Sequence, residues 1–217
     1  MSGTLDARPV APRYREYRPH PALAPWVRCY WTIAAEDAAP TPNRICPDGC
    51  ADIIVDLGAP APPVGRTGGL RAYAVGTMRS PVVVPMSGRI DMIGIRFRPG
   101  GARAFLGVPL VQLTDRTAPL EALGWRGVAI LEEQLAESAE PAVRLSRLEE
   151  ALSCRRPRTR ARAGAGTPGA IDLLERTHGA LSIRDVTRAT GLSGRALERA
   201  FRDAVGVSPK RFARIVR

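Results

Sequence analysis

The chain has 217 residues, 45% of them hydrophobic, which is enough for one or two domains with a substantial core, and no apolar run approaches the roughly 20 residues that cross a bilayer. Its formal net charge is +11, and residues 155–217 hold 15 of the 32 lysines and arginines but 5 of the 21 acidic residues, a net charge of +10. A basic segment attached to a nearly neutral one is typical of a nucleic-acid binder with a separate sensor or partner domain, because neutralising phosphates releases counterions.

Residues 1–152 are expected to form a β-rich sensor or dimerisation domain, with proline- and glycine-rich breakers such as Pro40-Thr41-Pro42 between short strands. This pattern favours a small sandwich or barrel over a parallel sheet. The candidate strands cover residues 27–33, 51–57, 71–76, 82–85 and 89–97.

After Gly101 the pattern becomes helical, with a short helical turn over residues 102–106 and two longer segments beyond it. Two interpretations of the longer segments stay open: their leucines form a dimer seam, or they cover the sheet. The apolar residues concerned are Val128, Leu131 and Leu135 in the first segment and Leu145, Leu148 and Leu152 in the second.

Four residues are candidates for effector binding. Asp48, Cys50 and Asp52 flank a turn that leads into an apolar strand, and alternate residues of a strand share a face, so Cys50 and Asp52 could point together. Trp31 could line a pocket nearby. The simpler alternatives are that Asp48 and Gly49 form a turn in which the carboxylate binds its own backbone, and that Trp31 belongs to the core.

Cysteine and histidine content predicts neither a disulfide framework nor a metal site. Cys46 and Cys50 are four residues apart, but no second pair follows, and the chain has only two histidines. Because the start MSGTLDARPV lacks a targeting pattern, we expect a cytoplasmic protein without metal or other cofactor and without a membrane partner.

Motifs that would indicate catalysis are missing: the sequence has no P-loop, no Gly-x-Ser-x-Gly elbow and no His-Glu-x-x-His helix. We therefore do not expect an enzyme. An enzyme built on the barrel would need a polar pocket that holds Asp48, Asp52 or the arginines. Arg96 and Arg98 flank Phe97 and could meet an anion, but they are explained more simply as exposed strand residues.

A flexible, arginine-rich linker is predicted over residues 153–166, where arginines, glycines and a proline replace any apolar periodicity. Beyond it, the last 36 residues predict two short helices around a tight turn and the start of a third helix. Ser182 and Ser193 can cap the two helices, Gly191 suits the turn, and Gly206 ends the second helix before a new start at Ser208-Pro209. This is the order of a DNA-binding helix-turn-helix over residues 167–217.

The second of these helices carries polar residues on its outer face. Arginine can bind the O6 and N7 atoms of guanine in a bidentate way and glutamate can accept from cytosine, each contributing about 1–3 kcal/mol of discrimination. A serine at the helix start would sooner meet phosphate. The alternative is an ordinary solvated helix face. The candidate DNA-binding residues are Ser193, Arg195, Glu198, Arg199 and Arg202.

The stretch TGLSGRALERAFRDAVGVSPKRFARIVR resembles the first helix-turn-helix of AraC-type bacterial transcription regulators, through Gly-Leu-Ser, Leu197, Arg199, Phe201, Gly206 and Ser208-Pro209-Lys210. In that family two such motifs, joined by a long helix, occupy successive segments of the major groove. The resemblance implies double-stranded DNA as partner, RNA polymerase as a further partner of an activator, and base- or backbone-contacting roles for the five residues above.

Residues 14–151 resemble, less specifically, the sensor domains that precede this motif, through Leu23-Ala24-Pro25, Trp31, the segment from Pro47 to Asp52 and Gly94-Ile95-Arg96-Phe97. Such domains are often cupin-like barrels that dimerise and take a small effector. We therefore expect an α+β transcriptional regulator, with a homodimer and a small-molecule effector as open possibilities. The sequence ends at Arg217 without the family's second motif, so the alternative is a ligand-binding or heterodimerising protein without productive DNA binding.

Overall fold

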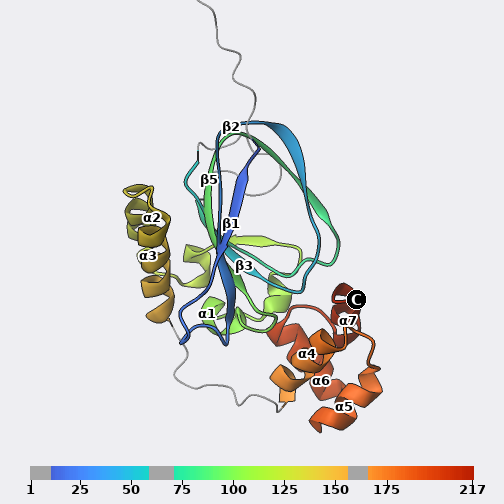
Figure 1. Ribbon diagram of the computed structural model, residues 1–217. Coiled ribbons are helices and arrows are strands. Elements are labelled where there is room, and N and C mark those ends of the chain that lie inside the picture. Colours follow the sequence, from blue (N-terminus) through green and yellow to red (C-terminus); the bar gives the residue numbers. More distant parts are fainter. Residues whose placement is uncertain (1–10, 59–70, 156–165) are drawn as a thin grey trace, which may run out of the picture.

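The computed structural model describes residues 11–58, 71–155 and 166–217, and it is an α+β structure with an antiparallel sheet followed by helices (Figure 1). We refer to the described residues between 11 and 155 as the sheet unit and to residues 166–217 as the helical unit. The linker predicted over 153–166 lies largely outside the described residues, since α3 ends at Ser153 and α4 begins at Gly166.

The sheet has six strands in the order β1-β2-β5-β3-β4-β6, and every neighbouring pair is antiparallel. The preference for an arrangement other than a parallel sheet is thus confirmed. The strands are β1 (Arg13–Tyr17), β2 (Val27–Ile45), β3 (Asp52–Asp56), β4 (Ala72–Val75), β5 (Val82–Phe97) and β6 (Thr117–Pro119).

Strands β2 and β5 are longer than the sequence predicts. Pro40-Thr41-Pro42 was expected to end a strand, but β2 continues through it, with register shifts against β5 between Ala35 and Ala38 and between Ala38 and Thr41. Such irregularities accommodate prolines that cannot donate to the ladder. The two strands expected over 82–85 and 89–97 are likewise one strand, because β5 pairs along the length of β2.

The sheet unit buries one face of the sheet under helices α1 (Arg103–Leu106), α2 (Val128–Ala136) and α3 (Pro141–Ser153). Figure 1 shows α2 and α3 together on one side of the strands. Of the two interpretations of their leucines, the packing supports the second, because these side chains lie in the core and cover the sheet. The core contains Val128, Leu131, Leu135, Leu148 and Leu152, with Leu145 packed against it.

Arg144 of α3 fastens the helices to the sheet. Its Nη1 and Nη2 atoms donate to Oδ1 and Oδ2 of Asp91 on β5 at 2.6 and 3.0 Å, and its Nε donates to the carbonyl oxygen of Leu135 at 2.8 Å. Arg144 is only 8% exposed. A buried arginine is tolerated here because a bidentate carboxylate and a carbonyl together satisfy its donors.

The helical unit forms a separate core from α4 (Gly166–Arg176), α5 (Ile183–Thr190), α6 (Gly194–Ala204) and α7 (Pro209–Ile215). The predicted caps are confirmed. The hydroxyls of Ser182, Ser193 and Ser208 each accept from the backbone N–H three residues on. The turn between α5 and α6 contains Gly191 with a φ of 69°, a left-handed conformation that glycine adopts without a Cβ clash.

The two units dock at the carboxyl end of α6. Thr77 donates through its hydroxyl to the carbonyl oxygen of Val205 at 2.6 Å, and Thr114 does the same to Gly206 at 2.7 Å. The carbonyl of Val205, the C-cap residue of α6, lacks a partner within the helix, and Thr77 of the sheet unit satisfies it. Arg103 of α1 also pairs with Asp203 of α6 at 3.0 Å. In Figure 1 the helical unit lies at the end of the sheet near α1.

Within the part of the chain that the structure describes, no helix has the length and apolar character needed to cross a membrane.

Candidate nucleic-acid interface

Helix α6 is the central element of the candidate DNA site. Leu197 and Phe201 are fully buried on its inner side, where Phe201 packs against Phe212 of α7 at a ring-centroid distance of 5.7 Å. Burial of one face leaves the opposite face free, and Arg195 and Arg199 lie exposed on it. The amphipathic spacing therefore orients the basic side chains outward.

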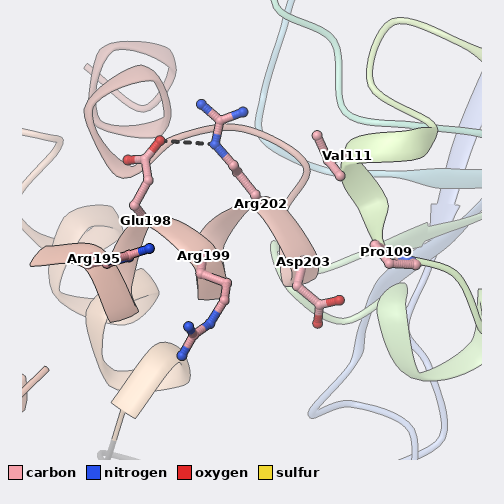
Figure 2. Close-up of a pocket in the computed structure, with 7 residues that line it drawn as sticks. All are labelled: Pro109, Val111, Arg195, Glu198, Arg199, Arg202 and Asp203. Carbon is pink, nitrogen blue, oxygen red and sulfur yellow. Dashed lines mark hydrogen bonds and ion pairs between the residues drawn. The ribbon is translucent and has the colours of Figure 1, made fainter. Parts of the chain in front are cut away.

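Four of the five predicted DNA-binding residues lie around one hollow of about 470 Å³, and Ser193 caps the start of the same helix. Figure 2 shows Arg195, Glu198, Arg199 and Arg202 together on α6. The other side of the hollow belongs to the sheet unit, through Pro109 and Val111 at the short 3₁₀ helix η1 (Leu110–Gln112).

The charges on this face differ in how they are held. Glu198 accepts from Nε of Arg202 at 3.1 Å, one helical turn away, and both side chains are about half exposed. Such an exposed i,i+4 pair is weak. Arg195 and Arg199 make no ion pair with any residue that the structure describes. These two arginines are thus available to an outside partner.

Two of the four candidate effector residues meet directly in the sheet unit. The indole Nε1 of Trp31 on β2 donates to Oδ1 of Asp52 on β3 at 2.9 Å. Strand β5 lies between them, and Gly94 sits opposite both Trp31 and Ile54. A side chain at position 94 would collide with the indole ring, so the glycine lets the ring reach across β5.

Arg96 completes this cluster, so the simpler interpretation of Arg96 as an exposed strand residue is wrong. Its Nε donates to Oδ1 of Asp52 at 3.2 Å and lies 3.8 Å from Oδ2 of Asp48. Residues two apart in a strand share a face, so the sequence alone places Arg96 and Gly94 on the same face of β5. Its carboxylate partner becomes visible only through the register in which Asp52 pairs with Arg96.

Asp48 and Cys50 form the turn that the simpler interpretation of the sequence described. The N–H of Cys50 donates to Oδ1 of Asp48 at 2.9 Å. Cys50 is buried, and burial, followed by the nearby charge of Asp48, raises the pKa of its thiol. A protonated, buried thiol is a poor nucleophile, so the structure offers no support for a reactive cysteine at this position.

Asp52 has the most perturbed carboxyl of the cluster. Burial raises its pKa to about 6, although the charge of Arg96 and the hydrogen bond from Trp31 act in the opposite direction. Its contacts to Trp31 and Arg96 occupy one of its oxygens. An effector at this position would have to displace these contacts or use the remaining oxygen.

Comparison with known proteins concerns the sheet unit. Residues 15–119 match the model of a family described as Domain of unknown function (DUF6597), a span from β1 to β6 that is compatible with an N-terminal domain ahead of the helices. No model of an AraC-type or helix-turn-helix family matched the chain. No significant match to a curated protein or to a solved structure was found.

Proposed function

We propose that the protein is a DNA-binding transcriptional regulator. Its helical unit would act as an AraC-type helix-turn-helix with α6 as the recognition helix, and its sheet unit as a cupin-like sensor domain. The observation that best supports this proposal is the exposed face of α6. On this face Arg195 and Arg199 make no ion pair among the described residues, and Glu198 and Arg202 lie beside them.

The local structure around α6 fits this role. Ser193 caps the helix and its hydroxyl accepts from the N–H of Ala196 at 3.2 Å, so the first turn is ordered without help from the arginines. Helices α4, α5 and α7 share one core with α6 and hold its inner face. A helix supported in this way can present its outer side chains to base edges in a major groove.

Docking against the sheet unit would limit access to this face. A major groove is about 12 Å wide and a helix with side chains is about 10–12 Å across, so a groove that admits α6 has no room for a second element beside it. Val111 of η1 lies beside Arg202 and is 41% exposed. DNA binding would therefore require η1 and α6 to separate, and an effector could act by shifting that equilibrium.

The test is fluorescence anisotropy of the full chain with duplex DNA from upstream of its own gene and with a scrambled duplex, over a salt series. The variant Arg195→Ala/Arg199→Ala removes the two unpaired arginines, and Arg147→Ala on α3 is the matched control. We expect at least about tenfold preference for the upstream duplex (~1.4 kcal/mol), lost in the double variant and kept in the control. Equal, steeply salt-dependent binding to both duplexes would contradict sequence recognition and indicate phosphate contact alone.

A further inference from the structure

A second hollow lies between the two units, next to the face of α6 described above. It has a volume of about 690 Å³, within the range of about 300–1,000 Å³ that is usual for small-molecule sites. The sheet unit contributes Arg79 and Arg116 to its lining, and the helical unit contributes Arg202 and Arg211. With Asp115 as the one acidic residue of the lining, the hollow has a formal charge of +3.

Asp115 is already committed to one of these arginines. It accepts from the backbone N–H of Arg79 at 2.7 Å and from Nε of the same residue at 2.5 Å. Partial burial acts to raise the pKa of Asp115, but the hydrogen bonds from Arg79 and the charge of Arg211 outweigh it and leave the pKa lowered. The carboxylate therefore stays ionised and neutralises Arg79 only.

Arg202 is paired through its Nε with Glu198, whereas Arg116 and Arg211 keep donors without a carboxylate partner among the described residues. Arg116 is exposed, and its side chain makes no hydrogen bond or ion pair with any residue that the structure describes. One nitrogen of Arg211 donates to the carbonyl oxygen of Arg79, but its Nε is buried and has no acceptor among the described residues. A buried donor without an acceptor costs about 1–3 kcal/mol, and like charges gathered in one hollow repel.

We propose that this hollow binds a small, multiply charged anion of the phosphate class, which bridges the sheet unit and the helical unit. Guanidinium groups bind phosphate oxygens through paired N–H donors, and the hydroxyls of Ser80 and Ser208 in the lining offer further donors. The anion would neutralise arginines from both units at once. It would therefore stabilise their docking.

The inference rests on the proposed function in one respect, because Arg202 belongs to both hollows. An anion that engages Arg202 and holds η1 against α6 would oppose the separation that a major groove requires. The effector would thus be an anion of the phosphate class, and its binding would lower the affinity of the protein for DNA.

The test uses inorganic pyrophosphate as probe in isothermal titration of the full chain, at constant ionic strength. Arg116→Gln alters the hollow without touching docking contacts, and Arg126→Gln is the matched control, at an exposed arginine two residues before α2. We expect saturable binding that Arg116→Gln weakens at least about fivefold and that Arg126→Gln leaves unchanged. Absence of saturable binding, or equal effects of the two variants, would overturn the proposal.

Two further measurements test whether pyrophosphate binds at another site and whether the hollow binds the DNA backbone instead. Arg195 lies on the exposed face of α6 and outside the second hollow, so Arg195→Ala should leave pyrophosphate binding unchanged. If Arg195→Ala weakened pyrophosphate binding as much as Arg116→Gln, the anion would bind elsewhere and the proposed site would be wrong. A scrambled duplex should bind Arg116→Gln as well as it binds the parent chain. Weakened duplex binding with unchanged pyrophosphate binding would assign the hollow to the DNA backbone and overturn the proposal.

Addition of pyrophosphate should also weaken binding to the upstream duplex at least about threefold in the parent chain and not in Arg116→Gln. An unchanged or increased DNA affinity would overturn the bridging role. Pyrophosphate binding with the expected variant pattern in a chain that shows no DNA preference would support the anion site while contradicting the proposed function, so the two can fail separately.

Discussion

The sheet unit and the helical unit hold their charged side chains in opposite ways. In the sheet unit, Arg144 and Asp91 are largely buried, and they pair with each other across α3 and β5. In the helical unit, Arg195 and Arg199 are exposed and make no ion pair within the described residues. The fold needs the first pair of residues and makes no use of the second. This difference separates charges that stabilise the structure from charges that can serve a partner.

The comparison is sharpest at Arg144. Arg144→Ala should lower the free energy of unfolding by about 3–5 kcal/mol, because Asp91 is left largely buried and unpaired and the carbonyl of Leu135 loses its donor. Arg147→Ala, three residues on, breaks only an exposed pair with Glu150 and should change stability by less than about 0.5 kcal/mol. Urea denaturation of both variants measures the difference, and equal effects would show that the Arg144 pair is not structural.

Asp52 is a second largely buried charge of the sheet unit, but burial disfavours its ionised form. Its pKa of about 6 in the folded chain exceeds the value of about 3.9 for an ordinary aspartate, so the folded state binds more protons between these values. The contribution of Asp52 to stability should therefore fall by about 2 kcal/mol as the pH rises from 4 to 7.

Asp52→Asn removes this titration, and the difference between parent and variant isolates it from the titration of other groups. Denaturation midpoints measured at several pH values should show a shallower decline for Asp52→Asn. Parallel curves for the two proteins would mean that Asp52 is not held in a protonation-sensitive environment.

The cap of α6 should have a smaller effect. Ser193→Ala removes the acceptor for the N–H of Ala196 and should destabilise the chain by about 1 kcal/mol. Ser193→Asp retains an acceptor at the helix start and should restore most of that loss. Thermal unfolding of the two variants distinguishes capping from a role in DNA contact alone, for which stability would not change.

The smallest effect is expected on the exposed face of α6. Glu198→Ala breaks the ion pair with Arg202, and the free energy of unfolding should change by less than about 0.5 kcal/mol, because both side chains are substantially exposed. A loss of several kcal/mol in the same denaturation assay would show that this face has a structural role and would remove the contrast between the units.

Features that depend on contacts between residues close in sequence can be predicted from the sequence, and features that depend on distant segments cannot. Ser182, Ser193 and Ser208 each cap a helix through a contact within three residues, so the sequence predicts these caps correctly. The course of β2 through Pro40 depends on its pairing with β5, which no local pattern reveals.

The same holds for the sites. The basic face of α6 could be predicted because its residues share one helix and one spacing. The contact of Trp31 with Asp52 requires three strands in register and a glycine between them. The arginine hollow could not be predicted at all, because Arg79, Arg116 and Arg211 come from separate segments that meet only when the units dock.

The most direct test of the account is whether one side chain of α6 recognises one base pair. The affinities of the parent chain and of Arg199→Ala would be measured for a set of duplexes in which each base pair of the bound site is replaced in turn. We predict that the parent chain discriminates by about 1–3 kcal/mol at a G·C pair and that Arg199→Ala loses this discrimination at that pair alone. An equal loss of affinity for every duplex, or unchanged discrimination at every pair, would contradict the assignment of α6 as a DNA-reading helix.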